Sequence, residues 1–394
     1  MRIGVDATSW VNRRGYGRYT RGLMTATLEL DQDNHYTFFV DCESEEFPLP
    51  AGVEVCRVAT KTPTIKAAGA DSRRSVADMW AVASAIRRAR VDVVHFPTDY
   101  SYVPFFMGVP RLVTIHDAIA ELFPDLVFPT LRSKMFYRAK MKSGIHQARL
   151  LITVSEYSRR QLVEKLKIPA ARLRVVSEAP DPVFQASQSD SSSEVLARWG
   201  VPSDAKCLIF VGGFSPHKNL FMLVDVVREL VGQDAFHNLR LVLVGDYTGD
   251  SFYSCYSQLA ERVRLDRLEQ HVLFTGRLED KDLIVLLNRA DALVLPSVCE
   301  GFGLPAVEAA ACGTPVLATT ESPIPGLLGD GVIAISPRDR PGWLRAIERV
   351  LTDASLRQHM SEAALAAASR LSWKNSARQL LSVFDEVQRN GAAA

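Results

Sequence analysis

The chain has 394 residues, of which 47% are hydrophobic and 23% charged, a composition typical of a globular protein and a length that predicts two domains. No run approaches 18 apolar residues, so we expect no membrane-spanning helix. The formal charge is +1, but residues 1–180 carry 26 Lys and Arg against 19 Asp and Glu, and the remainder carries 20 against 26. This balance excludes a polycation and predicts that the first half meets an anionic partner.

The first half of the sequence contains seven short apolar runs that are rich in β-branched residues. They are continuous rather than alternating, which predicts parallel strands buried on both faces. Amphipathic stretches at 75–90 and 155–166 predict helices between them. The predicted strands lie within residues 1–7, 35–42, 53–59, 92–97, 111–117, 149–156 and 172–179.

A polar, serine-rich break, QASQSDSSSE at 185–194, separates the two halves and predicts a linker. The strand pattern then restarts within 206–213, 239–246, 271–276, 291–297, 315–320 and 332–336. We therefore predict an α/β protein of two doubly wound, Rossmann-like domains, at 1–184 and 195–371. Residues 372–394 predict a C-terminal helix that packs back on the first domain.

Six cysteines, at positions 42, 56, 207, 255, 299 and 312, include no C-x-x-C pair and are typical of reduced cytosolic thiols. The first residues, MRIGVDATSW, predict a strand and not a signal peptide. We expect a cytoplasmic protein, with association at the inner face of a membrane left open.

Ligands of open α/β sheets bind at the carboxyl ends of the strands, and the chemically interesting residues follow predicted strands. We therefore expect a single cleft between two facing domains. The residues concerned are Gly15–Gly17, His116-Asp117, Gly212-Gly213, Gly245, Gly276 and Glu300.

The stretch CEGFGLPAVE at 299–308 carries the strongest signal. Pro305 suits the first turn of a helix, and the turn Gly301-Phe302-Gly303-Leu304 before it offers backbone N–H groups to a phosphate. Glu300 and Glu308 are carboxylates, which accept hydrogen bonds from hydroxyl groups. A nucleotide sugar, with hydroxyls on both sides of its diphosphate, matches this layout. The alternative is that the glutamates only complement the helix dipole and the glycines only shape a turn.

Four further positions are weaker candidates, and each has a plainly structural alternative. Lys218, in GGFSPHKNL, is placed as a counter-charge for phosphate or is a solvated lysine at a helix start. Gly15, Gly17 and Arg18 lie in a loop that enters a helix, which approaches a phosphate or is a plain turn. His116 is functional or a hydrogen-bonded structural residue. Arg277 lines a base pocket or lies on the surface.

Signals for other chemistries are missing from the sequence. There is no Walker A, G-x-S-x-G, H-E-x-x-H or zinc-ligand spacing. A D-x-D at 31–33 lies between a helix and a strand, and we interpret it as a solvated turn. We expect no metal site and no cofactor other than a nucleotide-sugar substrate.

Taken together, the motifs resemble those of retaining glycosyltransferases of family 4, which have the GT-B fold. The E-x7-E segment at 300–308, with its G-F-G-L-P, is the most specific match. The others follow the family's order and extend the resemblance to nearly the whole chain. They are YGRYTRGL, TIHD...ELFP, TVSEYSRRQL, RVVSEAPDPVF, FVGGFSPHKNL, LVLVGD, LFTGRL and ALVLPSVCEGFGLPAVEAAACGTPVLA.

The resemblance implies roles. Three residues are expected to be catalytic: Glu300 on the sugar hydroxyls, Lys218 on the leaving diphosphate, and His116 beside the C6 hydroxyl of the reacting sugar. Transfer would proceed with retention, with the donor's own phosphate oxygen taking the acceptor proton and without Glu300 as a nucleophile. The residues expected to bind the donor are Gly15, Gly17, Arg18, Gly213, Arg277, Gly301, Phe302, Gly303, Leu304 and, on the ribose, Glu308.

Two positions depart from the family's pattern. Relatives often have Gly-Arg where this chain has Gly212-Gly213, so Lys218 or Arg18 has to compensate for the missing cation. Many relatives have Asn-Gly where this chain has Glu178-Ala179. That difference leaves open how the junction between the domains is held.

A basic segment follows Asp125 and contains no acidic residue before Glu156. Its hydrophobic residues Leu131, Met135 and Phe136 are interleaved with basic ones. The segment predicts contact with an anionic lipid surface or a lipid-diphosphate acceptor, or it is a solvated helix face. The basic residues are Arg132, Lys134, Arg138, Lys140, Lys142 and Arg149.

The motifs HKN and IHD...FP look most like those of mannosyltransferases that act on O-antigen-type chains, which favours GDP-mannose as donor and a glycan or lipid-linked glycan as acceptor. A UDP-sugar is the main alternative. A nucleotide-sugar epimerase of GT-B type and a non-catalytic carbohydrate-binding relative remain open. A nucleic-acid partner is not expected, because the second half is acidic and a basic aromatic array is missing.

Overall fold

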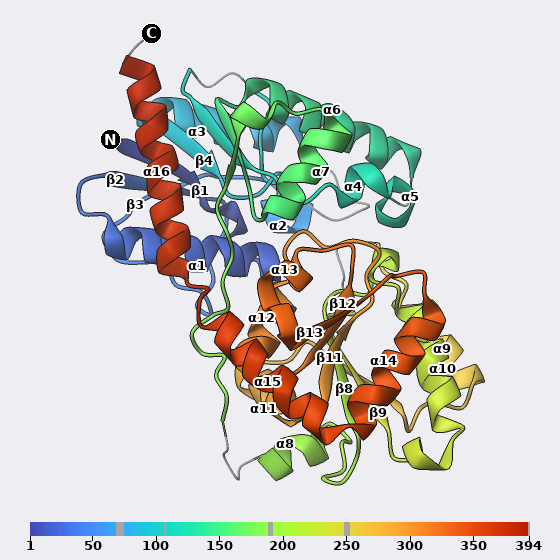
Figure 1. Cartoon of the computed structure of the whole chain (residues 1–394). Helices are drawn as coiled ribbons and strands as arrows, with labels where there is room; N and C mark the ends of the chain where they lie inside the picture. Colours follow the sequence, from blue (N-terminus) through green and yellow to red (C-terminus); the bar gives the residue numbers. More distant parts are fainter. Residues whose placement is uncertain (68–74, 106–107, 129, 188–191, 248–252, 393–394) are drawn as a thin grey trace. The chain divides into compact units, whose positions relative to one another are not determined.

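The computed structural model describes residues 1–67, 75–105, 108–128, 130–187, 192–247 and 253–392 (Figure 1). The chain forms two compact units: Met1–Glu178 with Ser372–Ala394, and Ala179–Leu371. The first stretch of this unit therefore ends at Glu178, whereas the sequence predicted that the first domain ends at residue 184. Residues 188–191 of the predicted linker and 393–394 of the predicted tail lie outside the described residues.

The first unit is built on a parallel sheet in the order β3-β2-β1-β4-β5-β6-β7. Ile3 of β1 pairs with Tyr36 of β2 on one side and with Val93 of β4 on the other. The chain order reverses between these neighbours, which is where doubly wound sheets bind ligands. The strands are β1 (Arg2–Asp6), β2 (His35–Val40), β3 (Glu54–Arg57), β4 (Val93–Phe96), β5 (Arg111–Thr114), β6 (Leu150–Thr153) and β7 (Leu173–Val175).

Helices cover both faces of this sheet. Side-chain caps begin several of them: the hydroxyl of Ser75 accepts from the N–H of Asp78 at 2.9 Å, and that of Ser155 from Ser158 at 3.0 Å. The helices are α1 (Gly15–Leu30), α2 (Thr64–Ala67), α3 (Val76–Ala89), α4 (Ile119–Leu122), α5 (Pro124–Val127), α6 (Leu131–Gln147), α7 (Glu156–Leu166) and α16 (Trp373–Ala392), with the 3-10 turns η1 (Ala7–Ser9) and η2 (Ala170–Arg172).

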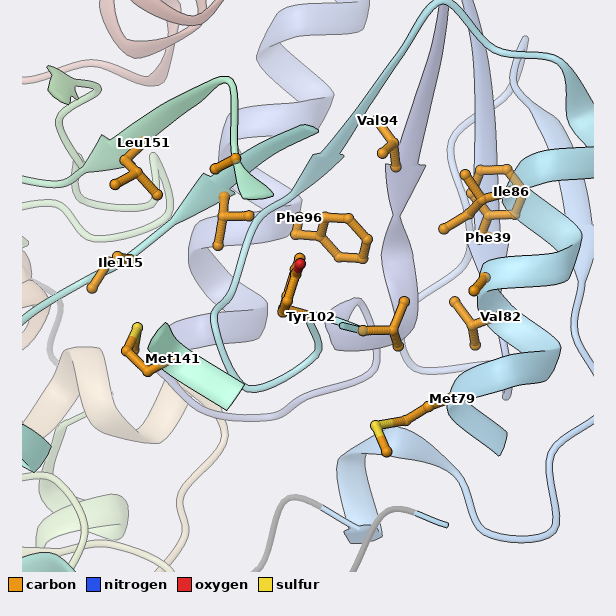
Figure 2. Packing of buried hydrophobic residues seen from close by; sticks show 14 of the residues in the cluster. Phe39, Met79, Val82, Ile86, Val94, Phe96, Tyr102, Ile115, Met141 and Leu151 are labelled. Carbon is orange, nitrogen blue, oxygen red and sulfur yellow. The ribbon is translucent and has the colours of Figure 1, made fainter. Parts of the chain in front are cut away.

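One face of the sheet packs on α3, α6 and α7. Figure 2 shows Met79 and Val82 of α3, Phe96 of β4 and Met141 of α6 in this hydrophobic cluster. Successive side chains of a strand point to opposite faces, so His95 lies on the other side, with its ring centroid 6.2 Å from that of Phe384 in α16. The polar His95 is thus buried beneath the C-terminal helix.

The C-terminal helix α16 is part of the first unit and lies beside α1 (Figure 1). A Cβ on Gly22 of α1 would lie 2.4 Å from the Trp373 ring, so only glycine allows this approach. At the other end of the contact, Arg174 and Glu386 form an ion pair with 2.7 Å between Nε and Oε2. The close approach at Gly22 and the ion pair of Arg174 therefore both hold α16 against the first unit.

The second unit repeats the architecture with a parallel sheet in the order β10-β9-β8-β11-β12-β13. Its strands are β8 (Cys207–Val211), β9 (Arg240–Val244), β10 (Val272–Gly276), β11 (Ala292–Leu295), β12 (Val316–Thr319) and β13 (Val332–Ile335). Its helices are α8 (Ser192–Arg198), α9 (Leu220–Val231), α10 (Tyr256–Leu265), α11 (Asp280–Arg289), α12 (Leu304–Ala311), α13 (Ile324–Leu328), α14 (Arg340–Thr352) and α15 (Ala354–Ala368), with the 3-10 turns η3 (Pro216–Lys218), η4 (Asp234–Phe236) and η5 (Gly329–Gly331).

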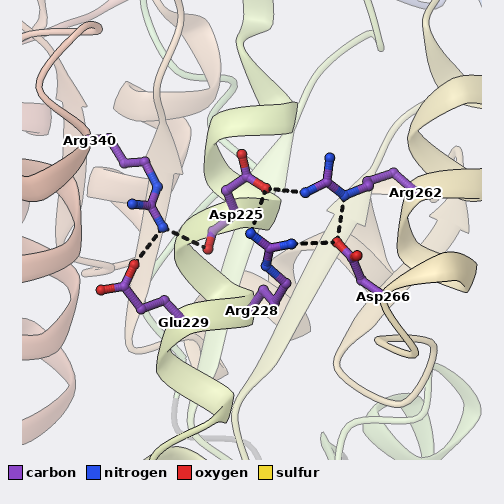
Figure 3. A network of polar contacts seen from close by, with 6 residues as sticks. All are labelled: Asp225, Arg228, Glu229, Arg262, Asp266 and Arg340. Atoms are coloured by element: carbon purple, nitrogen blue, oxygen red, sulfur yellow. Dashed lines mark hydrogen bonds and ion pairs between the residues drawn. The ribbon is translucent and has the colours of Figure 1, made fainter.

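A polar network joins α9, α10 and the start of α14 (Figure 3). Asp225 of α9 contacts Arg262 of α10 at 2.8 Å, and Arg228 of α9 contacts Asp266 at 3.4 Å. Arg340 donates to the carbonyl of Asp225 at 3.3 Å. These partly exposed contacts fix helix order more than they add stability, because water screens them.

Every apolar run predicted as a strand contains one of these strands, and both sheets are parallel. The prediction of two doubly wound, Rossmann-like α/β domains is confirmed.

Candidate active site

The turn before α12 is fixed by Gly303. Gly303 is the N-cap of α12 and has a φ of 93°, a left-handed conformation that favours glycine. A Cβ there would lie 2.7 Å from Cδ1 of Ile324, so space also excludes a side chain. Pro305 occupies the first helical turn, as predicted. The first N–H groups of a helix have no partner inside it, so this helix end favours anions.

Lys218 and Glu300 form a buried ion pair that includes the first residue of this turn. Nζ of Lys218 lies 2.7 Å from Oε1 of Glu300, and the Ser297 hydroxyl donates to the same oxygen at 2.6 Å. Burial raises the pKa of Glu300, but the charge and hydrogen bond of Lys218 and the hydrogen bond of Ser297 outweigh it and leave the pKa below its usual value. Glu300 is therefore an ionised carboxylate at neutral pH.

The two carboxylate oxygens of Glu300 differ in their contacts. The described residues supply partners to Oε1 only, although the side chain is just 11% exposed. A carboxylate oxygen accepts hydrogen bonds in two directions. Oε2 can thus take a substrate hydroxyl without displacing Ser297.

The loop that carries Lys218 is tied to neighbouring loops by backbone and amide groups. Asn219 follows η3 with a φ of 58°, and its amide donates to the carbonyls of Pro296 and Pro337 at 3.2 and 3.0 Å. The N–H of Val298 donates to the carbonyl of His217 at 2.8 Å. These bonds hold the loops after β8 and β11 together, which sets the distance between Lys218 and Glu300.

His217 also belongs to this cluster, although the sequence did not single it out. Burial and the charge of Lys218 lower the pKa of His217 to about 3, so its imidazole is neutral. Its Nδ1 is buried and has no hydrogen-bond partner among the described residues. A histidine next to a lysine in PHKN gives no sign of such burial, so only the fold reveals it.

Glu308 lies one turn into α12 and is 4% exposed. Its charge, after burial, contributes to a Cys312 pKa raised to about 12. Gly301, Phe302 and Leu304 occupy the turn and the first position of the helix. The E-x7-E segment therefore forms one local structure, a turn and a helix start with a carboxylate at each side.

Gly213 and Arg277 follow β8 and β10 at the same carboxyl edge of the second sheet. A Cβ on Gly245 would lie 2.0 Å from the carbonyl oxygen of Gly212, so the loops after β8 and β9 approach as closely as backbone permits. Tyr247 and Tyr256 stack nearby, with ring centroids 4.1 Å apart and planes 5° from parallel. The sequence analysis missed this pair, because a tyrosine in the loop after β9 and another at the start of α10 carry no motif.

Gly15, Gly17 and Arg18 begin α1 in the first unit. A Cβ on Gly17 would lie 1.8 Å from the carbonyl oxygen of Asn12, so the loop is folded tightly onto the helix start. The helix has no side-chain cap at Arg14. The N–H groups of Gly17 and Arg18 donate to the carbonyl of Arg14 at 3.0 and 3.1 Å, so binding of an anion by this helix start stays a prediction for the N–H groups before them.

His116 follows β5 at that same edge and is 7% exposed. Its Nδ1 lies 3.2 Å from Oε1 of Glu178, and its Nε2 lies 3.0 Å from the carbonyl oxygen of Pro97. Glu178, which departs from the family's pattern, is thus a partner of a predicted site residue. A hydrogen bond from His116 to a substrate requires the exchange of one of these contacts.

The predicted site residues thus form two sets, one in each unit. Lys218 and Glu300 meet directly, whereas His116 and the start of α1 belong to the first unit. The expectation that both sets line one cleft stays a prediction. Within the described residues, no group of three or more His, Cys, Asp or Glu is arranged to hold a metal ion, and the metal-free reaction also stays a prediction.

The predicted basic segment forms α6, with Leu131, Met135 and Phe136 exposed at 71%, 64% and 49%. Lys134 contacts Asp125 at 3.2 Å and Arg138 contacts Glu121 at 3.3 Å, while Lys140 donates to the carbonyl of Tyr100. Arg132 and Lys142 are exposed on the same helix. Among the described helices, none combines the length and apolar character that crossing a bilayer requires.

Comparison with known families assigns the two halves of the chain to glycosyltransferase families. The profile of "Glycosyltransferase Family 4" matches residues 15–182, and that of "Glycosyl transferases group 1" matches residues 192–367. The D-inositol 3-phosphate glycosyltransferase of Corynebacterium jeikeium is 30% identical over 294 residues, which are 72% of this chain and 68% of that protein.

Two further relatives differ in named activity and in coverage. The D-inositol 3-phosphate glycosyltransferase of Corynebacterium aurimucosum is 30% identical over 61% of this chain, which spans only 57% of that protein. The O-antigen chain mannosyltransferase B of Escherichia coli is 28% identical over 73% of this chain and 74% of its own length.

Solved structures share the fold over essentially the full length. Sucrose-phosphate synthase from Thermosynechococcus elongatus has a TM-score of 0.77 at 19% identity, with 100% of both chains covered. Alr3699/HepE from Anabaena, solved with UDP and glucose, has a TM-score of 0.74 at 16% identity over 98% of this chain and 99% of its own. These identities support the fold alone.

The two Rossmann-like units, each on a parallel sheet, and the solved structures that share them place the chain in the GT-B fold class. The chain belongs to the family 4 glycosyltransferases, as its motifs predicted.

Proposed function

We propose that the chain is a retaining hexosyltransferase that moves mannose from GDP-mannose onto a glycan or lipid-linked glycan, as in O-antigen or other polysaccharide synthesis. The observation that carries the proposal is the Lys218–Glu300 pair beside the helix start of α12. A cation, an ionised carboxylate and free helical N–H groups together fit a diphosphate that bears a sugar.

In the proposed reaction, Lys218 and the N–H groups of Phe302, Gly303 and Leu304 hold the diphosphate. Glu300 accepts sugar hydroxyls through Oε2, and Glu308 accepts those of the ribose. The sugar–phosphate bond breaks as the acceptor oxygen bonds to the anomeric carbon, and a phosphate oxygen of the donor takes the acceptor proton. The protein's contribution is charge stabilisation, and one positioned donor is worth about 3 kcal/mol.

The choice of GDP-mannose as donor is supported by the resemblance of the motifs to those of mannosyltransferases and by one of the relatives. The O-antigen chain mannosyltransferase B of Escherichia coli favours mannose. A UDP-sugar is the second candidate, because HepE, a structural neighbour, was solved with UDP and glucose. Gly213 and Arg277 remain the proposed donor contacts of the second unit, with Gly15, Gly17 and Arg18 in the first.

The proposal is tested by a transfer assay in EDTA with GDP-mannose, UDP-glucose and UDP-galactose, following both nucleoside diphosphate release and sugar incorporation into a lipid-linked glycan fraction. We expect one donor to support transfer without metal. Release of an altered sugar nucleotide without acceptor would identify an epimerase instead. Binding without release from any donor would identify a non-catalytic relative.

Glu300→Gln keeps the size of the side chain and removes its charge. We expect it to lower transfer by about 100-fold or more, since the sugar then loses its charged acceptor. Glu279→Gln, in an exposed pair with Lys281, is the matched control and should leave transfer unchanged. Turnover of Glu300→Gln within a few-fold of the parent would show that the site is wrongly assigned.

A further inference from the structure

His116 has a protein acceptor at each ring nitrogen, and the chemistry of these acceptors fixes its protonation. The carbonyl oxygen of Pro97, at 3.0 Å from Nε2, only accepts hydrogen bonds, and so does a carboxylate of Glu178 in its ionised form, at 3.2 Å from Nδ1. With Glu178 ionised, both ring nitrogens therefore carry a proton. The proton of the pair resides on the imidazole, because its usual pKa exceeds that of a glutamate by about two units.

The surroundings of the ring favour this charge. Tyr16 and Tyr19 of α1 pack against it nearly perpendicularly, in T-shaped contacts with ring centroids at 4.9 and 4.6 Å. Burial lowers the pKa of His116, but the hydrogen bond and charge of Glu178 outweigh burial, and Asp99 after β4 adds to them, so the pKa is raised.

The other charged or titratable groups nearby do not reverse this balance. His95 of β4 is neutral, because burial and His116 lower its pKa to about 3. Asp117 follows His116 in the chain and adds negative charge near Tyr16, whose pKa is raised by burial and then by Asp99 and Asp117. The neighbours of His116 are thus aromatic, neutral or acidic.

We infer that Glu178 is a positioning residue that keeps His116 doubly donating and positively charged at the carboxyl edge of the first sheet. The inference rests on the proposed function, in which His116 lies by the donor sugar. A fixed positive charge there stabilises the diphosphate anion that leaves when the sugar–phosphate bond breaks. Glu178 acts through His116 and does not itself touch the substrate.

Glu178→Gln tests this role, because it preserves the shape of the contact. A glutamine amide can donate to Nδ1, which leaves the imidazole neutral. We expect the His116 pKa, followed by 15N NMR of labelled histidine in the full chain, to fall by at least about one unit. His116→Gln assigns the signal. Glu164→Gln, on the exposed side of α7, removes the same charge from the same unit and should leave the His116 signal in place.

Kinetic measurements then distinguish a role of Glu178 in keeping His116 charged from a role that only supports the fold. With Glu178→Gln, kcat at pH 7.5 should fall by up to about tenfold and recover at lower pH, because an imidazole returned to its ordinary pKa of about 6.5 is only about one-tenth charged at that pH. Glu178→Asp, which keeps a carboxylate, should restore part of the charge and of kcat. A loss of kcat that is equal at every pH would show that Glu178 only supports the fold, and the inference would be wrong.

The two proposals fail in different ways. An unchanged His116 titration in Glu178→Gln overturns the inference even if transfer proceeds. A charged His116 in a protein that transfers sugar from no donor leaves the ion pair in place and overturns the proposed function.

Discussion

Lys218 and Glu300 neutralise one another, although in the proposed function each binds a different part of the donor. Their side chains are 19% and 11% exposed, so the ion pair lies in surroundings where an unpaired charge is costly. A free nucleoside diphosphate that takes Lys218 leaves Glu300 with Ser297 alone. A nucleotide sugar supplies hydroxyls to Glu300 at the same time. If the donor binds as proposed, the pair therefore favours the complete nucleotide sugar over the spent nucleotide.

A double-mutant cycle measures how much the Lys218–Glu300 ion pair contributes to the free energy of unfolding. Lys218→Met leaves a buried carboxylate without its cation, and we expect it to lower the free energy of unfolding by about 3 kcal/mol. Adding Glu300→Gln removes the stranded charge and should recover at least half of that loss. Urea unfolding of the four proteins measures the coupling. Lys281→Met, at an exposed pair, is the control and should show no measurable change.

Equal stability of the single variant and the double variant would contradict this account of the pair.

His95 makes the first unit sensitive to acid. It is buried beneath α16, with Nε2 bonded to Thr114 at 3.0 Å, and its pKa is lowered to about 3. The unfolded chain, with a His pKa of about 6.5, binds more protons between these values, so stability falls as pH drops through that window. His95→Gln removes this titration. We expect its stability, from urea unfolding at pH 7 and pH 5, to decline less than that of the parent.

The control is His146→Gln, at an exposed position of α6, which should keep the parent's dependence on pH. Parallel curves for His95→Gln and the parent would rule out His95 as the acid-sensitive group.

Helix α1 connects several features of the first unit. Gly17 in its first turn packs against Asn12, Tyr16 and Tyr19 contact His116, and Gly22 packs against Trp373 of α16. These contacts all lie within the first two turns of one helix. A small shift of α1 would therefore disturb the surroundings of His116 and the packing of the C-terminal helix together.

Helix α6 carries exposed apolar and basic residues on successive turns, as a helix that lies on an anionic membrane does. We expect the double variant Arg132→Gln/Lys142→Gln to bind phosphatidylglycerol vesicles about thirtyfold more weakly at low salt, since each cation near such a surface contributes about 1 kcal/mol. Vesicle sedimentation measures this. Arg160→Gln/Lys165→Gln on α7, with the same charge change, should bind as the parent does.

Equal binding by both double variants would leave α6 as a solvated helix face.

The strands and the local part of the site were open to prediction from sequence, because each depends on neighbouring residues. Buried parallel strands appear as continuous apolar runs, and Gly303 followed by Pro305 indicates a turn and the start of a helix at these positions. The contacts that complete the site join distant residues. Lys218 and Glu300 are 82 residues apart in the sequence, and His116 and Glu178 are 62 residues apart.

Such contacts depend on how strands and loops pack, which periodicity does not encode. The neutral His217, the stacked Tyr247 and Tyr256, and the contact between His116 and Glu178 were accordingly found only in the folded chain. The sequence predicted that Glu178 was unusual for the family, but the structure was needed to show what it contacts.

The most direct test of the account is calorimetric titration of GDP and UDP, in EDTA, into the full chain and into Lys218→Met. The account predicts that one nucleotide binds the parent protein and binds Lys218→Met at least about tenfold more weakly, since the diphosphate loses its buried counter-charge. Equal affinity in both proteins would place the diphosphate elsewhere. Binding of neither nucleotide to the parent would contradict the assignment of this site to a nucleotide-sugar donor.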